Sequence, residues 1–382
     1  MKILAIDDQQ LILLSLEKKL IELGYHVKTA DSGIGGMELF DSFNPDLVIV
    51  DINMDKVSGM DVIKHIRIEK KSITPIMVMS GNNDEEVIVE GFDLGISDYM
   101  KKPVSLNEVA ARVKRLIGDS PNKKEVINKD LGANRIISGK CIGVVIPCYN
   151  EETRLLSKEF TDFVHSNLGY HLCFVNDGSK DNTLKVLQNL RKGREDNISI
   201  FDCEKNGGKG EAVRQGVLFL SKDPQLDYIG YLDADLSTDF KDFDDLVKTI
   251  QTSDYKIVSG SRISRMGANI TKESARRIIS LTINFIIQNI LGMKFKDTQC
   301  GAKIMDKDIV NNMFDKKFIT RWLFDVEIFM RMKKFYGKEK AKTMICEQPL
   351  KRWIHADGSK LSMKDSAKIV GQLMQIAVHY NK

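Results

Sequence analysis

The chain has 382 residues, of which 42% are hydrophobic and 29% are charged, and this length allows two or three domains that each bury a core. It contains no run of 18 apolar residues, so no membrane-spanning helix is predicted. Its six cysteines form no CxxC pair, which argues against a zinc site or a disulfide framework. The N-terminus lacks the apolar core of a signal peptide, so we expect a cytoplasmic protein.

The charge is unevenly distributed along the chain. Residues 1–118 contain 14 Lys and Arg against 19 Asp and Glu, a net charge of −5, whereas the remainder contains 43 against 34, a net charge of +9. A basic second part suits an anionic ligand such as a diphosphate, or an anionic membrane face. The alternative is that acidic and basic surfaces of the chain dock on each other.

Residues 1–118 alternate short apolar runs with amphipathic segments. The predicted strands are Lys2–Asp7, His26–Thr29, Leu47–Asp51, Ile76–Ser80 and Asp98–Met100. The predicted helices lie at about 9–23, 33–43, 58–70, 84–94 and 105–117. Five such repeats predict a doubly wound α/β domain with a parallel sheet, in which functional side chains lie beyond the carboxyl ends of the strands.

Acidic side chains follow two of these strands. Asp7 and Asp8 close the first strand and Asp51 closes the third, so a parallel sheet brings all three carboxylates to one edge. Like charges repel unless a cation joins them, and oxygen ligands suit Mg²⁺. A carboxylate beside Mg²⁺ can act as a nucleophile toward phosphorus and become an aspartyl phosphate. Ser80 and Lys102, which follow the fourth and fifth strands, would offer a hydroxyl and an ammonium to that group.

A single aspartate at a strand end is usually a helix N-cap, but five matching positions are poorly explained in that way. With them, residues 1–118 resemble the receiver domain of bacterial response regulators, which has a flavodoxin-like (βα)5 fold. The resemblance implies that Asp51 is phosphorylated, that the Lys102–Pro103 peptide is cis, and that a sensor histidine kinase or a phosphotransfer protein is a partner. A homodimer through this domain is a further expectation. The implied metal ligands are Asp7, Asp8, Asp51 and the backbone carbonyl of Asn53, and the implied switch residues are Ser80, Tyr99 and Lys102.

A polar linker is predicted at residues 119–140, because the stretch 118–124 combines Gly and Pro with polar residues. A second α/β series then occupies residues 141–382. Its predicted strands are Ile142–Pro147, His171–Asn176, Ile198–Asp202, Tyr228–Asp233 and Lys256–Gly260.

Short polar motifs follow the strands of this second series. The Gly207-Gly208-Lys209 motif precedes a helix, where backbone N–H groups and a lysine can meet a phosphate. Asp233 and Asp235 stand two residues apart after an apolar strand, so they can chelate one divalent cation that would bridge the diphosphate of a nucleotide sugar. An isolated Asp-x-Asp is most often structural, but its position behind the other loops favours the metal site.

Together these motifs resemble family-2 glycosyltransferases of the GT-A fold, over residues 141 to about 379. The later part, with Asp297–Lys303 and Arg321–Glu327, looks most like the dolichyl-phosphate glucosyltransferase branch. The resemblance implies an inverting enzyme that uses a UDP- or GDP-linked sugar with Mg²⁺ or Mn²⁺. The residues implied for the donor are Pro147, Tyr149, Glu151, Asp177, Lys209 and Asp233; those for the metal are Asp233 and Asp235; and the acceptor or catalytic candidates are Arg262, Gln299, Arg321, Trp322, Asp325 and Glu327.

Two kinds of acceptor remain open. A phosphomonoester is already anionic at neutral pH and needs little help from a base. The residues that could orient it are Arg262, Arg276, Arg277 or the pair Lys351-Arg352. A sugar hydroxyl would need a carboxylate base, for which Asp325 and Glu327 are candidates, although acidic residues at a helix start also complement its dipole. We expect a phosphorylation-regulated transfer to a polyprenyl phosphate. The alternatives are a soluble saccharide or protein acceptor, or a signalling scaffold whose transferase domain is inactive.

Two amphipathic segments, at residues 275–291 and 364–379, could lie on a membrane face, although such helices more often pack on a protein core. We therefore expect a cytoplasmic chain that can contact the inner face of the membrane peripherally. No helix-turn-helix pattern or dense basic helix occurs in residues 141–382, so nucleic acid is not an expected ligand.

Overall fold

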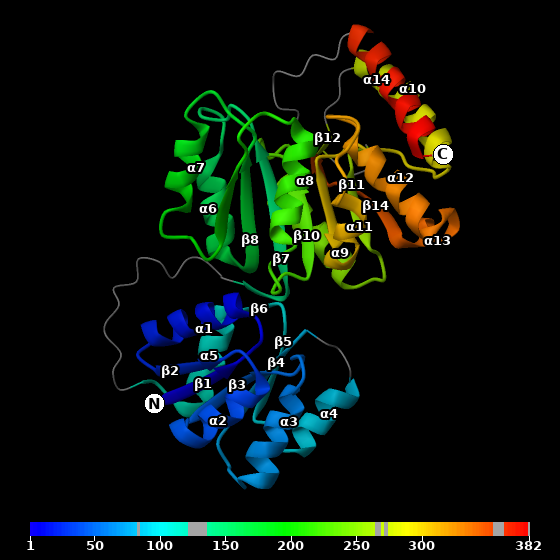
Figure 1. The fold of residues 1–382 in the computed structure, drawn as a ribbon. Helices are drawn as coiled ribbons and strands as arrows, with labels where there is room; N and C mark the ends of the chain where they lie inside the picture. Colours follow the sequence, from blue (N-terminus) through cyan, green and yellow to red (C-terminus); the bar gives the residue numbers. More distant parts are fainter. Residues whose placement is uncertain (82–84, 121–135, 264–268, 271–273, 354–362, 381–382) are drawn as a thin grey trace. The chain divides into compact units, whose positions relative to one another are not determined.

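The computed structural model describes residues 1–81, 85–120, 136–263, 269–270, 274–353 and 363–380. The chain forms two compact units, one of residues 1–141 with 162–170 and the other of residues 142–161 with 171–382 (Figure 1). Most of the predicted linker, residues 121–135, lies outside the described residues. Residues 136–140, which the sequence analysis also assigned to the linker, instead begin strand β7.

The first unit contains a five-stranded parallel sheet in the order β2-β1-β3-β4-β5, which confirms the predicted fold class. Its strands are β1 (Lys2–Ile6), β2 (His26–Ala30), β3 (Leu47–Asp51), β4 (Ile76–Ser80) and β5 (Asp98–Lys101). The strand order reverses at β1, between β2 and β3. The carboxyl ends of β1 and β3 therefore form the place where ligands bind in doubly wound sheets.

Helices cover both faces of this sheet, which is why its strands are apolar on both sides. One face is covered by α1 (Gln10–Glu22) and α5 (Leu106–Ile117). The other is covered by α2 (Gly33–Phe43), α3 (Gly59–Lys64) and α4 (Glu85–Asp93). The predicted helix at 58–70 is α3 continued by a π-helical turn, His65–Glu69. A short strand, β6 (Val104–Ser105), precedes α5.

A second, mixed sheet has the order β14-β11-β13-β10-β7-β8-β9, and most of its residues belong to the second unit. Its strands are β7 (Ile136–Cys148), β8 (Asn167–Asn176), β9 (Ile198–Asp202), β10 (Tyr228–Leu232), β11 (Ile257–Ser261), β13 (Ala302–Asp306) and β14 (Ile345–Pro349). β10 is parallel to β7, but β13 is antiparallel to both β10 and β11. Strands β13 and β14 were not predicted from the sequence. In β13 the charged Lys303 occupies a fully buried position, which interrupts the apolar pattern of a buried strand.

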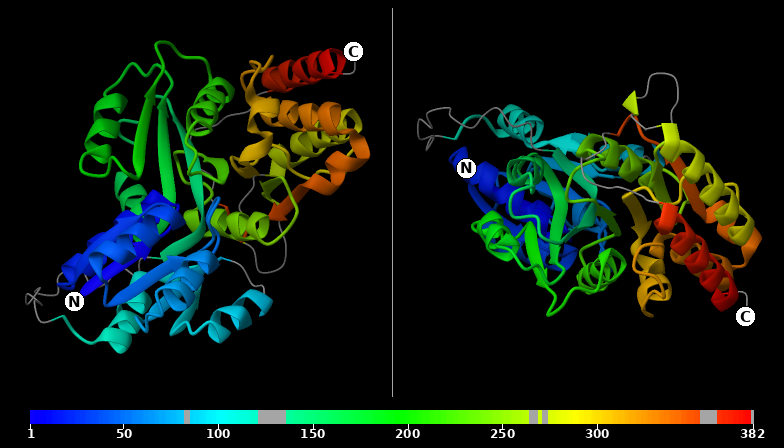
Figure 2. Two further views of the ribbon diagram at one scale, coloured as in Figure 1. Left: turned by 60° about the horizontal axis from the view of Figure 1, so that its bottom comes forward. Right: turned by 90° about the horizontal axis from the view of Figure 1, so that it is seen from above.

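The helices of the second unit include α7 (Thr183–Arg191), α8 (Lys209–Leu220), α9 (Phe240–Gln251), α11 (Val310–Phe314) and α13 (Lys338–Met344). Another helix, α6 (Ser157–Ser166), has residues in both units. Three more, α10 (Ser274–Leu291), α12 (Phe324–Tyr336) and α14 (Met363–Tyr380), pack against one another. Figures 1 and 2 show α10 and α14 side by side. Strands β12 (Asn269–Ile270) and β15 (Arg352–Trp353) form a separate parallel pair. Within the described residues, no helix has the length and apolarity needed to cross a membrane.

Candidate functional site

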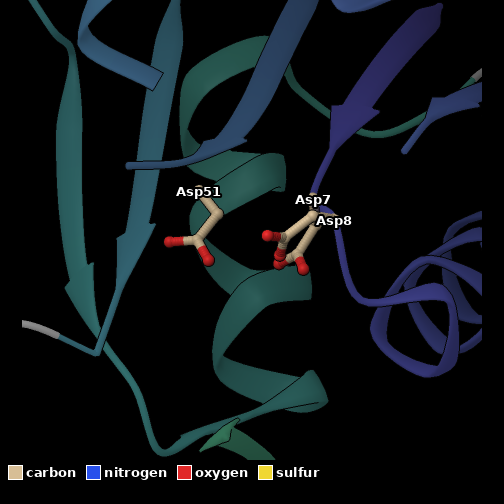
Figure 3. A group of neighbouring side chains, drawn as sticks. All are labelled: Asp7, Asp8 and Asp51. Atoms are coloured by element: carbon tan, nitrogen blue, oxygen red, sulfur yellow. The ribbon is translucent and has the colours of Figure 1, made fainter. Parts of the chain in front are cut away.

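Three carboxylates meet at the carboxyl end of the first sheet, as predicted from the sequence (Figure 3). Asp7 and Asp8 follow β1 and Asp51 ends β3, and one oxygen from each lies within 4.8 Å of the others. Burial, together with the charge of Asp7, raises the pKa of Asp8. Burial also raises the pKa of Asp51 to about 6, although Lys102 opposes this shift. The clustered hard oxygen ligands fit Mg²⁺, which would relieve the repulsion among them.

Lys102 is the counter-ion of this cluster. Its buried ammonium donates to Asp7 Oδ2 at 2.7 Å and to Asp51 Oδ2 at 3.0 Å. Burial disfavours the charge on Lys102, but the two carboxylates outweigh burial and hold its pKa above the ordinary value. The Lys102–Pro103 peptide is cis, as predicted.

The other predicted switch residues lie beside Asp51. The backbone N–H of Asn53 donates to Asp51 Oδ1 at 3.4 Å, and its side-chain amide donates to Ser80 Oγ at 3.3 Å. Burial raises the pKa of Tyr99, against the effect of a hydrogen bond with Ser80. The structure thus connects these residues to Asp51, and their roles in metal binding and switching remain predictions.

Gly59 is a residue of this site that the sequence analysis missed. A Cβ at this position would lie 2.1 Å from the backbone carbonyl oxygen of Asp51, so only glycine fits. The helix that Gly59 begins is capped by Ser58 and Asp61, which exchange hydrogen bonds in a capping box. The capping-box spacing could have located the start of this helix, but the close approach to Asp51 depends on the tertiary fold.

We predict that Asp51 accepts a phosphoryl group. Full-length protein incubated with a small phosphodonor and Mg²⁺ should gain the mass of one phosphoryl group, as measured by intact mass spectrometry. Asp51→Asn should gain none, whereas Asp93→Asn, an exposed position on α4, should label like the wild type. Equal labelling of Asp51→Asn would show that another residue is the acceptor.

In the second unit, Asp177 holds the glycine-rich loop, residues 206–208, through hydrogen bonds. Its Oδ1 accepts from the N–H of Gly207 at 2.7 Å, and its Oδ2 accepts from the N–H of Gly208 at 2.9 Å and from Asn206 Nδ2 at 2.9 Å. Gly208 has a φ of 88°, which favours glycine. The sequence analysis expected Asp177 in the nucleotide pocket; here its carboxylate holds the loop that precedes α8.

Lys209 and the two predicted metal ligands lie next to this loop. Lys209 begins α8, and its Nζ lies 2.5 Å from Asp233 Oδ1. Asp235 is exposed, and its Oδ1 accepts from the N–H of Ser237 at 2.9 Å and from its hydroxyl at 2.7 Å. The Asp233 carboxylate fills the space where a side chain at Gly301 would stand, because a Cβ there would lie 1.9 Å from Asp233 Oδ2. Two carboxylates on one short loop are hard ligands that fit Mg²⁺ or Mn²⁺.

The remaining predicted donor residues lie at the end of β7 and in the loop after it. Pro147 is half-buried and Tyr149 is exposed, while Glu151 pairs with Arg154 at 2.8 Å. Burial raises the pKa of Glu151; Arg154 opposes the shift, and the charge of Asp235 adds to it. The loops after β7 and β10 therefore lie close together, as the parallel pairing of these strands requires.

Arg262 does not lie free to orient an acceptor. Its guanidinium donates to Asp297 through Nε at 2.7 Å and through Nη2 at 2.9 Å, and its backbone N–H donates to the same carboxylate at 2.9 Å. Burial disfavours the charge of Arg262, but Asp297 outweighs burial and holds the pKa of Arg262 above its ordinary value. This bidentate pair fixes the turn after β11.

The first candidate base, Asp325, is buried in the first turn of α12. Its Oδ1 accepts from the hydroxyl of Tyr231 and from the ammonium of Lys303 at 2.7 Å. Lys303 is itself fully buried and also donates to the carbonyl of Cys300 at 2.7 Å. A cation and a hydroxyl of the protein therefore already occupy one oxygen of the Asp325 carboxylate.

The second candidate base, Glu327, is fully buried and accepts four hydrogen bonds. The donors are the N–H of Ile319 at 2.9 Å, the N–H of Thr320 at 2.9 Å, the hydroxyl of Thr320 at 2.7 Å and the hydroxyl of Tyr380 at 3.0 Å. These bonds favour a structural role, in which Glu327 anchors the segment before Arg321 to α12 and α14.

Two exposed residues, Arg321 and Trp322, border Lys209. The carbonyl of Arg321 accepts from the N–H of Gly210 at 3.1 Å, and the Lys209 ammonium lies 6.0 Å from the centre of the Trp322 ring. Trp322 is 59% exposed, so its indole offers a flat apolar surface beside the Lys209 ammonium. The predicted acceptor segment therefore adjoins the glycine-rich loop.

Gln299 lies in the turn that leads to Gly301 and β13. Its Nε2 and the Oγ1 of the neighbouring Thr298 are buried and have no hydrogen-bond partner within the described part of the chain. An unmet buried donor is costly, so both groups are available to a ligand. Because Gly301 packs on Asp233, these groups belong to the same region as the predicted metal ligands.

We predict that Glu327→Gln destabilises the second unit by about 2–4 kcal/mol, because an amide keeps only one of the two acceptor oxygens and turns an NH₂ group toward donors at the other. Urea unfolding followed by tryptophan fluorescence measures this effect, since both tryptophans, Trp322 and Trp353, belong to the second unit. Glu339→Gln, at an exposed position on α13, should leave the unfolding midpoint unchanged. A Glu327→Gln variant of full stability would contradict the structural role.

Models of two protein families match the chain: the response regulator receiver domain at residues 3–114, and glycosyl transferase family 2 at residues 143–314. A curated relative, the dolichyl-phosphate beta-glucosyltransferase of Dictyostelium discoideum, is 30% identical over 254 residues, which cover 63% of this chain and 74% of the relative. The dolichyl-phosphate beta-glucosyltransferase of Homo sapiens is 30% identical over 237 residues, which cover 58% and 70%.

Solved structures resemble each part of the chain. Chemotaxis protein CheY4 of Vibrio cholerae is 27% identical with a TM-score of 0.29, covering 30% of this chain and 97% of that chain. Glucosyl-3-phosphoglycerate synthase of Mycobacterium tuberculosis, solved with Mn²⁺, uridine diphosphate and glucosyl-3-phosphoglycerate, is 16% identical with a TM-score of 0.46, covering 63% and 80%.

Proposed function

We propose that this chain, which belongs to glycosyl transferase family 2 and carries a response regulator receiver domain, transfers a sugar from a nucleotide sugar to a polyprenyl phosphate under the control of phosphorylation at Asp51. The proposed acceptor depends on one observation, which is that other groups of the protein already bind the two carboxylates on α12. Asp325 is held by Lys303 and Tyr231, and Glu327 accepts four hydrogen bonds.

This arrangement suits an acceptor that needs no base. A sugar hydroxyl must lose its proton as it attacks, which requires a nearby general base. A phosphomonoester is already charged near neutral pH. The names of the relatives state a dolichyl-phosphate acceptor and a glucosyl group. They support a polyprenyl phosphate as the acceptor and a glucosyl group as the transferred sugar here.

The donor site is proposed from the loops after β8 and β10. Asp233 and Asp235 would hold Mg²⁺ or Mn²⁺, which, when bound, supplies the positive charge that neutralises the leaving UDP or GDP. Lys209, at the start of α8, suits the diphosphate, because the start of a helix favours anions. Thr298 and Gln299 offer hydrogen-bond donors to hydroxyl groups of the sugar or to the acceptor.

A membrane surface is the proposed place of the reaction, since polyprenyl phosphates are membrane lipids. Phe285 on α10 is 66% exposed, and Met374 and Val378 on the adjacent α14 are 65% and 60% exposed. The opposite sides of these helices pack inward through residues such as Ile287 and Leu373. With the net charge of +9 beyond residue 118, these features support reversible peripheral contact with the inner face of an anionic membrane.

We expect labelled UDP- or GDP-linked sugar, Mn²⁺ and a short-chain polyprenyl phosphate to give label in the organic phase. Asp235→Asn should lower this transfer at least about tenfold, because it removes a ligand of the cation. Asp254→Asn, at an exposed position after α9, should transfer at the wild-type rate. Transfer to a soluble saccharide or protein, with none to the lipid, would contradict the lipid acceptor alone, and nucleotide binding without any transfer would favour a scaffold.

We expect phosphorylation of Asp51 by a kinase or phosphotransfer partner to change the transfer rate, by about 5–150-fold if the coupling is typical of two-site regulation. The measurement is the same transfer assay, run with and without a small phosphodonor. Asp51→Asn should transfer at one rate under both conditions. A wild-type rate that stays constant while Asp51 is fully phosphorylated would contradict regulation through this residue.

A further inference from the structure

One ion pair joins a residue expected to meet the diphosphate to a residue expected to bind the cation. Lys209 Nζ lies 2.5 Å from Asp233 Oδ1, and the two side chains are only 24% and 30% exposed. A divalent cation that used this oxygen of Asp233 would meet the ammonium of Lys209. Two positive charges cannot share one carboxylate oxygen at this distance without strong repulsion.

The backbone holds both members of the pair in place. Before Lys209, the N–H groups of Gly207 and Gly208 are bonded to Asp177, and after it the N–H of Gly210 donates to the carbonyl of Arg321. On the other side, Asp233 packs against the backbone of Gly301. The pair therefore separates most easily by rotation of the long lysine side chain, while the loops stay in place.

Lys209 lies among carboxylates. Its ammonium pairs with Asp233, and Asp235 stands two residues further along the same loop. A nearby dianionic group could draw the ammonium away from Asp233, because Lys209 stands at the start of α8, where anions are favoured.

We propose that Lys209 exchanges partners when the donor binds, from Asp233 to the diphosphate, so that Asp233 is released to the cation; this exchange rests on the proposed nucleotide-sugar donor. Lys209 then acts as a positioning residue that disfavours metal binding in the absence of a diphosphate. The cation and the nucleotide diphosphate bind together, and each strengthens the binding of the other. A nucleoside monophosphate carries less charge and reaches less far, so it releases Asp233 poorly.

The test measures Mn²⁺ binding from the electron paramagnetic resonance signal of free Mn²⁺. The full chain is used with Asp8→Asn, which weakens the receiver carboxylate cluster. Without nucleotide, Lys209→Met should bind Mn²⁺ about tenfold more tightly than the Lys209 protein. UDP or GDP should tighten Mn²⁺ binding about tenfold more in the Lys209 protein than in Lys209→Met. Lys205→Met, an exposed lysine before the same loop, removes the same charge and should behave like the Lys209 protein.

Equal Mn²⁺ affinities of Lys209→Met and Lys205→Met would overturn the exchange. If Lys209→Met does not fold, the test uses the protein with Lys209 in place. There the diphosphate nucleotide should strengthen Mn²⁺ binding much more than the monophosphate. Equal effects of the two nucleotides would overturn the exchange. Absence of any UDP or GDP binding would remove the proposed donor and the exchange with it. Normal metal-dependent nucleotide binding without a Lys209 effect would remove the exchange alone.

Discussion

A carboxylate that leaves water must be compensated by a cation or by several hydrogen-bond donors, and both functional regions of this chain depend on that requirement. In the first unit, the ammonium of Lys102 donates to both Asp7 and Asp51, which offsets the repulsion between these two carboxylates. In the second unit, the ammonium of Lys303 compensates the buried carboxylate of Asp325. Removing one partner would leave an unpaired buried charge, so these pairs constrain which substitutions the two sheets tolerate.

The kind of compensation separates carboxylates that shape the fold from those that can meet a ligand. Asp177 and Glu327 accept backbone N–H groups from loops, so their oxygens are used to position the chain. Asp8 and Asp235 are more accessible, and within the described residues neither forms an ion pair with a lysine or arginine at 4.0 Å or less. Such groups can take a cation without first breaking the fold.

Much of the first unit could be predicted from the sequence because its functional residues directly follow strands. An apolar run that ends in Asp7 or Asp51 reveals the strand and the carboxylate together, and parallel pairing then brings the residues to one edge. In the second unit the decisive contacts join distant segments. Asp297 meets Arg262 across 35 positions, and Asp325 meets Tyr231 across 94. No local pattern encodes such pairs, so Arg262 and Asp325 seemed free in the sequence, and the buried Lys303 concealed strand β13.

The hydrogen bond from Tyr380 to Glu327 gives the last helix a mechanical connection to the region of Lys209. Glu327 also holds the backbone of Ile319 and Thr320, which lead directly to Arg321 and Trp322. A force or displacement applied to α14 would therefore pass through two hydrogen-bonded side chains to the rim of the glycine-rich loop. Besides covering the core, α14 is thus joined through Tyr380 and Glu327 to the backbone that leads to that rim.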